Sequence, residues 1–140
     1  MTKLKERPLF VDEDISPLLV DILKRSNFKA ERVKLGEIDA INAKNLKNDG
    51  ILLTSNIRDI QGRRGKGALG RQNATIIVIS QKLASNFTLL TQYLINLSTR
   101  MEFNTTLLTT GKKILLKDDG SIEEYMSKYQ KYYPSGIPKW

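Results

Sequence analysis

The chain lacks cysteine and histidine altogether, and these two absences exclude many functions. Without cysteine there is no disulfide, no zinc–thiolate site and no thiol nucleophile. Without histidine there is no Ser-His-Asp or Cys-His catalysis, no imidazole acting as general acid or base, and no histidine-ligated metal. Any metal ion would have to take oxygen ligands, which favours Mg²⁺ or Mn²⁺ over Zn²⁺.

Long apolar runs are also missing, and acidic residues are few relative to basic ones. No apolar stretch has membrane-spanning length, and residues 2–7 lead into no signal-peptide core, so we expect a cytoplasmic protein. Lysine and arginine number 23 against 15 acids, a net charge of +8. This excess makes nucleic acid the first partner to consider.

The order of apolar segments and turn residues along the 140 residues is typical of an α/β fold. We predict strands at 8–11, 30–35, 51–54, 75–80, 105–110 and 114–116, and helices at 16–25, 39–47, 82–101 and 123–133. This order indicates a mainly parallel sheet flanked by helices. Residues 1–124 form the predicted domain, and residues 125–140 form a basic, aromatic tail.

Three consecutive acids follow the first predicted strand of this basic protein. Asp12, Glu13 and Asp14 precede Ser16 and Pro17, which suit the start of a helix. Open α/β sheets bind ligands at the carboxyl ends of their strands. Carboxylates a few ångströms apart ionise together only with a cation between them, so these acids are candidate metal ligands. A solvated turn that supports the helix start is the alternative interpretation.

Polar residues at two further points are predicted to lie at the same edge of the sheet. Asn56 and Asp59 come after the third predicted strand, where Asn56 could act as a neutral ligand or orient a water molecule. Glu37 and Asp39 come after the second, where a carboxylate could complete a metal site. In the alternative interpretation the segment after the third strand is an ordinary loop in which Asp59 pairs with Arg58 or with a loop arginine, and Asp39 merely caps its helix.

A basic, glycine-rich segment, residues 56–73, is predicted to be a long loop leaving this edge. Glycines let backbone N–H groups approach phosphates, and basic side chains neutralise them. The predicted phosphate-binding residues are Arg58, Arg63, Arg64, Lys66 and Arg71. Residues 65–70 spell G-x-G-x-x-G, but a strand rather than a helix is predicted to follow, which excludes a dinucleotide site. A solvated loop without a ligand is the alternative.

Two segments are open between structural and binding roles. The tail mixes aromatic residues with Lys128, Lys131 and Lys139, a combination that can stack bases and contact phosphates. Docking of its aromatic side chains on the domain is the alternative. The apolar stripe of residues 82–101 is expected to be core, and a share of it could form a homodimer surface.

These segments together resemble the PIN-like nuclease domains, in particular a small stand-alone group found in prokaryotes. That group opens with strand–Asp-Glu-Asn/Asp–helix, to which residues 10–16 correspond. An acid-bearing helix start follows, which Glu37 or Asp39 matches loosely. An apolar strand with Thr-x-Asp-x-Asp-Phe comes next, to which residues 52–60 correspond. The resemblance extends from about Pro8 to Leu116.

The resemblance implies a PIN-like three-layer sandwich and a metal-dependent nuclease that cuts single-stranded RNA. In such enzymes carboxylates hold Mg²⁺ or Mn²⁺, the metal activates water, and cleavage leaves a 5′-phosphate. The residues it assigns to catalysis are Asp12, Asp14, Asp39, Asn56 and Asp59, and those it assigns to the metal are Asp12, Asp59 and Glu37.

The match departs from the family pattern at one acid. Asn56 stands in place of the first aspartate, one extra residue separates it from Asp59, and Ile60 replaces the aromatic residue. The loss of a carboxylate removes a charged ligand and lowers metal affinity. A non-catalytic PIN-like RNA-binding protein is therefore the alternative function. The resemblance also allows the toxin of a toxin–antitoxin pair, with a small antitoxin-like protein as partner.

Overall fold

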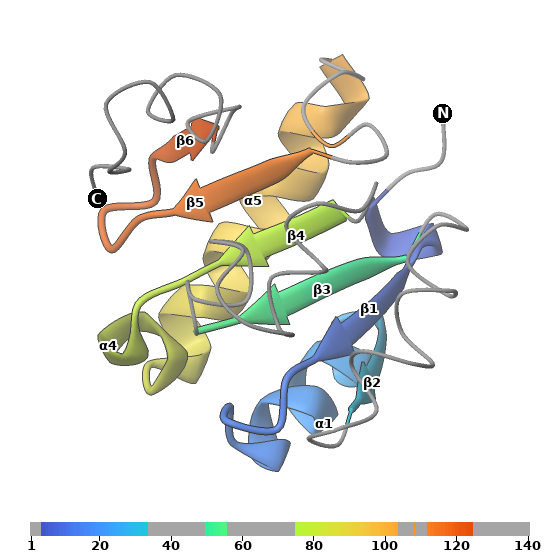
Figure 1. Cartoon of the computed structure of the whole chain (residues 1–140). Helices are drawn as coiled ribbons and strands as arrows, with labels where there is room; N and C mark the ends of the chain where they lie inside the picture. The colour runs from blue at the N-terminus through green and yellow to red at the C-terminus, as the bar shows by residue number, and fades with distance from the viewer. Residues whose placement is uncertain (1–3, 34–49, 56–74, 104–107, 109–111, 125–140) are drawn as a thin grey trace, which may run out of the picture.

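A six-stranded, mainly parallel sheet organises the part of the chain that the structure describes (Figure 1). The structure is a computed structural model, and it describes residues 4–33, 50–55, 75–103, 108 and 112–124. The strands are β1 (Pro8–Val11), β2 (Lys29–Arg32), β3 (Ile51–Thr54), β4 (Thr75–Val78), β5 (Lys113–Leu116) and β6 (Ile122–Glu124). They lie in the order β2-β1-β3-β4-β5-β6, and every neighbouring pair is parallel except β5 and β6. The predicted α/β class with a mainly parallel sheet is confirmed.

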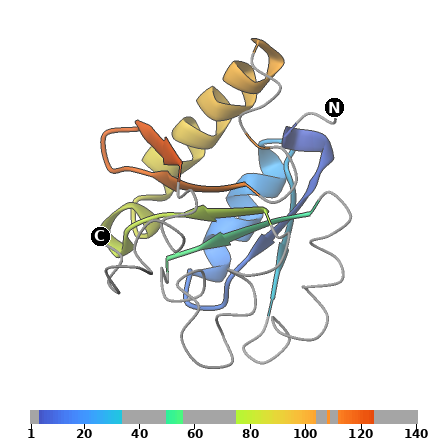
Figure 2. The same cartoon turned by 45° about the horizontal axis from the view of Figure 1, so that its top comes forward.

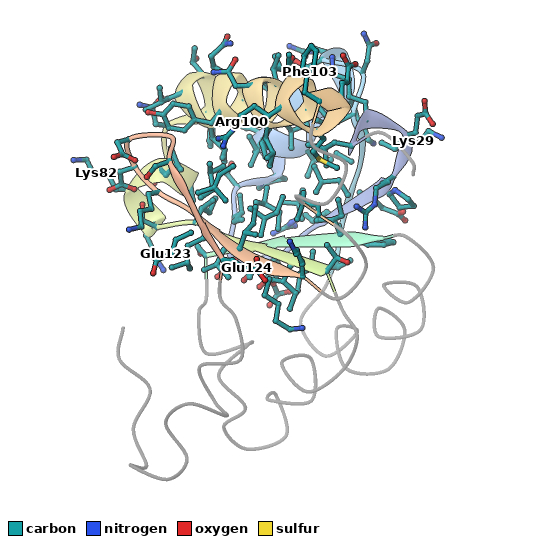
Figure 3. The ribbon with its side chains drawn as sticks, turned by 90° about the horizontal axis from the view of Figure 1, so that it is seen from above. Lys29, Lys82, Arg100, Phe103, Glu123 and Glu124 are labelled. Atoms are coloured by element: carbon teal, nitrogen blue, oxygen red, sulfur yellow. The ribbon has the colours of Figure 1, made fainter. Side chains whose placement is uncertain are left out.

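Two longer helices cover one face of this sheet. The helical segments described are a 3-10 helix (Leu4–Glu6), α1 (Pro17–Arg25), α4 (Gln81–Ala84) and α5 (Phe87–Phe103). Figures 2 and 3 show α1 and α5 on the same side of the sheet, and the two helices contact each other. The core between helices and sheet includes Leu9, Val11, Leu19, Leu23, Ile51, Leu53, Ile77, Leu90, Leu94, Leu97 and Ile114. Each such buried aliphatic side chain contributes about 1.5–3 kcal/mol of transfer free energy.

Helix α1 begins and ends where its sequence predicts. The Ser16 hydroxyl accepts a hydrogen bond from the Leu18 N–H at 3.2 Å, and Pro17 occupies the first helical position. At the other end, Phe28 N–H donates to the Leu23 carbonyl at 3.0 Å and Asn27 N–H to the Lys24 carbonyl at 3.1 Å. Asn27 has φ 70°, so this is a Schellman motif with asparagine in the left-handed position. It turns the chain directly into β2.

The single helix predicted over residues 82–101 is wrong, because two helices occupy this region. The Ser80 hydroxyl accepts from the Leu83 N–H at 2.9 Å and so caps α4. Because Ser80 belongs to this helix start, β4 ends at Val78 and is shorter than the predicted strand 75–80. The Asn86 side-chain oxygen accepts from the Leu89 N–H at 3.2 Å and caps α5. Side chains of serine and asparagine that bond the backbone in this way favour a new helix start over continuation.

The last helix predicted, over residues 123–133, is wrong in its first residues, because Ile122–Glu124 form the antiparallel strand β6. A tight turn returns the chain to β5: Gly120 N–H donates to the Lys117 carbonyl at 2.9 Å. The Asp119 carboxylate also accepts from the Ser121 N–H at 2.9 Å and from its hydroxyl at 2.6 Å. The ion pair between Lys117, which follows β5, and Glu123 of β6, at 2.7 Å, links the two arms of this hairpin.

Several predicted elements fall outside the described residues. These are the helix at 39–47, the loop at 56–73, the end of the strand at 30–35, most of the strand at 105–110, and the tail. Within 105–110 the one described residue, Leu108, lies in a turn. The predicted domain boundary after residue 124 stays a prediction, because the described residues end there.

The amino edge of the sheet is held by a buried charged side chain. Arg7, which immediately precedes β1, is 1% exposed. Its guanidinium donates to the Leu108 carbonyl and, at 3.5 Å, to the Thr75 hydroxyl at the start of β4. A buried guanidinium is tolerated only when its donors are satisfied in this way. Arg7 therefore links the start of β1 to the start of β4 and to Leu108 at the amino edge of the sheet.

Gly120 provides a test of the hairpin. Its φ of +85° lies in the left-handed region, and a Cβ there would lie 2.9 Å from the Tyr93 ring. Gly120→Ala is expected to lower the free energy of unfolding by at least about 1–2 kcal/mol in urea titration. Asn27 is the described non-glycine residue with a positive φ, a conformation that glycine adopts easily. Asn27→Gly should therefore leave the free energy of unfolding unchanged or slightly higher. Equal stability of Gly120→Ala and wild type would contradict this account of the turn.

Candidate functional site

The chain adds strands on one side of β1 and then on the other, so the strand order reverses between β1 and β3. The candidate site lies at this point. From β1 the chain goes to β2 on one side, whereas β3, β4 and β5 lie on the other side. In open α/β sheets, ligands bind in the crevice outside the carboxyl ends of the strands at such a switch point. Asp12 directly follows β1 and Ser55 directly follows β3, so both residues lie at this crevice.

Asp12 is a buried carboxylate joined to the neighbouring strand. It is 4% exposed, and its Oδ2 accepts a hydrogen bond of 2.7 Å from the Thr54 hydroxyl. Its backbone N–H donates to the Leu53 carbonyl at 2.9 Å, which extends the β1–β3 ladder by one residue. Taking a carboxylate out of water is costly, and among the described residues the Thr54 hydroxyl is the side-chain group that offsets this cost. A cation bound at this crevice would offset it further.

Asp14 forms a second link across the same crevice. Its Oδ2 accepts a hydrogen bond of 2.8 Å from the Ser55 hydroxyl. Desolvation of the carboxyl raises the pKa of Asp14, although the residue as a whole is exposed; the Ser55 hydrogen bond opposes this rise, and the negative charges of Asp12 and Glu13 add to it. A cation near both carboxylates would reverse the repulsive part of this effect.

The loop that carries these acids is fixed at its other flank by β2. Arg32, the last residue of that strand, donates from Nη2 to the Glu13 carbonyl at 3.1 Å. Ile15 N–H donates to the Asp12 carbonyl at 3.0 Å and turns the chain towards α1. Residues from β2 and from the end of β3 therefore hold the acidic turn from both sides, which reduces the entropy lost when a ligand binds.

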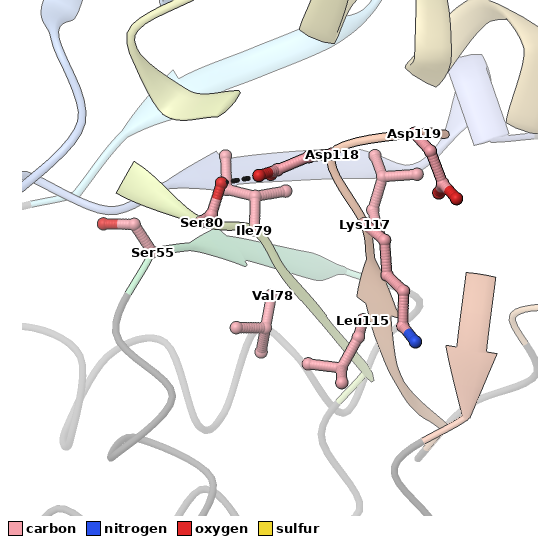
Figure 4. A pocket seen from close by; sticks show the side chains of 9 residues that line it. Ser55, Val78, Ile79, Ser80, Leu115, Lys117, Asp118 and Asp119 are labelled. Carbon is pink, nitrogen blue, oxygen red and sulfur yellow. Dashed lines mark hydrogen bonds between the residues drawn. The ribbon is translucent and has the colours of Figure 1, made fainter. Parts of the chain in front are cut away.

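Two cavities lie along this edge and meet at Ser55. The smaller, about 270 Å³, is lined by Asp14, Ser55 and residues at the starts of α1 and α5 and at both ends of α4. The larger, about 620 Å³, extends past the ends of β4 and β5. Its lining residues are Ser55, Val78, Ile79, Ser80, Leu115, Leu116, Lys117, Asp118 and Asp119, and Figure 4 shows them from close by. The carboxyl edge is thus hollow over several strands.

One of the predicted metal ligands, Asp12, lies in the described residues, and the metal site itself stays a prediction. Within the described residues, no group of three or more acidic residues gathers closely enough to hold a metal ion. Asp12 and Asp14 do supply two carboxylates at one crevice, with hydroxyls beside them, a donor set suited to a hard cation. The remaining candidates lie outside the described residues: Glu37, Asp39, Asn56, Arg58, Asp59, Arg63, Arg64, Lys66 and Arg71.

The sequence interpretation did not assign roles to Thr54, Ser55, Ser80 and Asp118. Thr54 and Ser55 hold the two acids, and the Ser80 hydroxyl hydrogen bonds to the Asp118 carboxylate across the larger cavity. A hydroxyl residue at the end of a fully apolar strand is the signal that could have identified the first two. The Ser80–Asp118 pair joins residues 38 positions apart, so it depends on the packing of β4 against β5.

The Asp14 carboxyl predicts a pH dependence of stability. The pKa of Asp14 is raised in the folded state, so between about pH 4 and that raised pKa the folded state binds more protons than the unfolded state. The free energy of unfolding therefore falls as pH rises through this window. In EDTA, Asp14→Asn should therefore be more stable than wild type at pH 7, by under about 1 kcal/mol because water screens the group. The gain should shrink as pH falls through the raised pKa towards about 4. Asp21→Asn, on the exposed surface of α1, is the control for lost charge; a stability loss in Asp14→Asn at pH 7 would refute the assignment.

Comparison with known proteins identifies no relative of this chain. Within the described residues no helix is both long and apolar enough to pass through a membrane. No protein-family model, curated protein or solved structure matches the chain.

Proposed function

We propose that the protein is a metal-dependent ribonuclease of PIN-like, three-layer architecture that cleaves single-stranded RNA at the crevice between β1 and β3. The observation that carries the proposal is the buried Asp12 carboxylate, hydrogen bonded to Thr54 at the switch point of the sheet. Evolution of a stable fold alone does not favour a buried acid there, because an apolar residue would avoid its desolvation cost.

The metal would be Mg²⁺ or Mn²⁺, held by oxygen ligands. Asp12 is its central ligand in the described part of the chain, and Glu37 and Asp59 complete the set in this proposal. When bound, such an ion lowers the pKa of a coordinated water and neutralises charge on the phosphate. Thr54 positions Asp12 by donating to one carboxylate oxygen, which leaves the other oxygen for the cation.

Proton transfer needs a group other than imidazole, because the chain contains no histidine. Asp14 suits this role, because its carboxyl lies at the same crevice and lines the smaller cavity. Ser55 holds the Asp14 carboxylate towards the crevice. Asp39 assists and Asn56 orients the attacking water in this proposal, in keeping with the side chains' hydrogen-bonding capacity.

RNA is the substrate that the charge of the protein favours. With a net charge of +8, the protein attracts polyanions, and Arg63 and Arg64 come shortly after the strand that carries Thr54. Acids that bind a cation and basic residues that bind phosphates are both needed by a phosphodiesterase. Single-stranded RNA further suits a crevice at the edge of a sheet, because its bases are unpaired and can enter cavities.

A non-catalytic RNA-binding protein is the second candidate. Asn56 in place of an acid favours it, and so does the absence of a three-acid cluster within the described ranges. The two functions share the basic residues and the crevice. They differ in whether Asp12 is required for a chemical step, which makes Asp12 the discriminating residue.

Asp12→Asn is expected to lower Mn²⁺-dependent cleavage of single-stranded RNA by at least about 100-fold. Asparagine keeps an oxygen that can accept from Thr54, so folding should be retained and is checked by thermal unfolding. Thr54→Val, of nearly equal shape, should weaken Mn²⁺ affinity about 10–100-fold by releasing Asp12. Mn²⁺ affinity is measured by calorimetry, and cleavage by gel analysis of a labelled RNA.

Asp21→Asn, on the far surface of α1, is the control for both variants and should cleave as wild type. If wild type binds RNA but shows no cleavage in Mn²⁺ beyond that in EDTA, the binding protein replaces the nuclease. If wild type and Asp12→Asn cleave equally, the crevice is not the active site.

Arg63→Ala/Arg64→Ala is expected to weaken RNA binding uniformly across sequences. Two lost phosphate contacts on a single strand should reduce the slope of log affinity against log salt by about 1.4. Lys24→Ala/Arg25→Ala at the end of α1 removes the same charge elsewhere and should leave the slope nearly unchanged. An unchanged slope in the first variant would exclude these arginines as phosphate contacts. Anisotropy of a labelled RNA at several salt concentrations provides the measurement.

A further inference from the structure

The smaller cavity at the carboxyl edge lies on the side of the sheet that the helices cover. Its lining residue Ile15 belongs to the core between helices and sheet. Ser55 follows the core residue Leu53 by two positions, so it lies on the same face of the sheet. The other lining residues come from the turn before α1, from α4 and from the start of α5, and Figure 3 shows α1 and α5 on this side. The groups that line the cavity therefore belong to one face of the sheet.

Apolar residues form part of the cavity wall. Ile15 and Ala84 are buried, and Phe87 is half-buried against the core, so part of its side chain stays open. The volume of about 270 Å³ is several times that of a water molecule, but it lies just below the range of sites that enclose a whole small molecule. The cavity therefore suits one ring of a larger ligand, with carbon atoms of that ring against the apolar wall.

Neutral polar groups complete the lining. The side-chain amide of Gln81 makes no hydrogen bond within the described part of the chain, and it carries both donors and an acceptor. The Ser85 hydroxyl donates to the Gln81 carbonyl at 3.0 Å, which leaves its oxygen able to accept. The Ser16 hydroxyl accepts from the Leu18 N–H at 3.2 Å, which leaves its proton to donate. A hydroxyl group on a ligand, which donates and accepts, matches this set.

The charge at the cavity argues against phosphate as its occupant. Among the described residues that line it, none is lysine or arginine, and Asp14 carries a negative charge. This carboxylate lies just before α1, where the helix start would otherwise attract an anion. A phosphate in the cavity would meet repulsion from Asp14 without a basic side chain to offset it. A neutral ring that bears hydroxyls, as a sugar does, fits both the apolar wall and the polar groups.

We propose that this cavity binds one ribose of the RNA strand and recognises its 2′-hydroxyl, which selects RNA over DNA; the inference rests on the proposed action on RNA. Ser55 lines the cavity, and Thr54 beside it in the chain holds Asp12, so the ribose lies next to the proposed cleavage point. The 2′-hydroxyl is the group by which a protein distinguishes RNA from DNA. In DNA the Gln81 amide loses this partner, and a site that hydrogen bonds a hydroxyl discriminates against a ligand without one.

The probes are a labelled oligouridylate about ten nucleotides long and the oligodeoxyuridylate of equal length. Both are bound in EDTA and followed by fluorescence anisotropy. Wild type is expected to bind the ribose strand about tenfold more tightly. Gln81→Leu removes the amide at nearly constant size and should reduce this preference to about threefold or less. Gln92→Leu, the same change at an exposed position of α5, should retain the preference. Thermal unfolding checks that both variants are folded.

A third strand, the 2′-O-methyl oligouridylate, keeps the oxygen but cannot donate a hydrogen bond from it, and its methyl group adds bulk. It should bind about as weakly as the deoxy strand. Equal affinity of wild type for the ribose and deoxy strands would overturn the proposal, and so would a preference that is unchanged in Gln81→Leu or is lost equally in Gln92→Leu. Tight binding of the 2′-O-methyl strand would overturn it as well.

The same measurements separate this inference from the proposed function on which it rests. Cleavage of the ribose and deoxy strands at equal rates in Mn²⁺ would overturn the ribose site and leave the nuclease standing. Failure of wild type to bind any of the three strands would overturn the action on RNA together with the ribose site.

Discussion

The hydrogen bond from the Thr54 hydroxyl to the Asp12 carboxylate is the interaction on which the candidate site depends. It joins residues 42 positions apart at the ends of β1 and β3, the two parallel strands between which the strand order reverses. This bond fixes the position of the buried Asp12 side chain. The negative charge of the carboxylate remains available to another partner. Ser55 and Asp14 repeat the arrangement one step further out, at a more exposed position. Two hydroxyls from one strand end thus hold two acids from its neighbour, and the crevice between them is fixed before any ligand binds.

The two edges of the sheet handle charge in opposite ways. At the amino edge, the donors of Arg7 meet the Leu108 carbonyl and the Thr75 hydroxyl, so the charge is used to hold the fold together. At the carboxyl edge, the buried Asp12 has one hydroxyl donor among the described residues and lies beside Asp14, which lines the smaller cavity. Burial of both charges costs free energy. Arg7 offsets this cost through contacts that hold the fold together, whereas Asp12 lies at the switch point of the sheet, beside the cavities of the carboxyl edge, and this place makes the carboxyl edge the functional candidate.

Local patterns predicted the strands at Pro8–Val11 and Ile51–Thr54 and both ends of α1, because apolar runs and capping residues act over a few positions. The helix predicted over 82–101 failed because its apolar stripe continues past Asn86, whose side chain caps a new helix that the stripe does not reveal. The strand β6 was missed for a different reason: Ile122–Glu124 has little strand signal of its own and pairs because the turn at Asp119 and Gly120 delivers it to β5. The site divides in the same way. Asp12 could be found from its place after an apolar strand, but the Ser80–Asp118 pair depends on tertiary packing that no local pattern encodes.

A common row of side chains runs from the candidate site across the sheet. Thr54, Val78 and Leu115 are neighbours in register, so the residue that positions Asp12 belongs to a row that spans β3, β4 and β5. Because a sheet deforms little, this row holds Thr54, and with it the Asp12 carboxylate, at a fixed place at the carboxyl edge. Holding a reacting group in place supplies orientation, which is worth far more to a phosphodiesterase than added affinity. In the proposed nuclease the fixed position of Asp12 would serve a reaction, whereas in a protein that only binds RNA it would have no reaction to serve. The two proposed functions therefore differ in what they require of Asp12, and its need in cleavage decides between them.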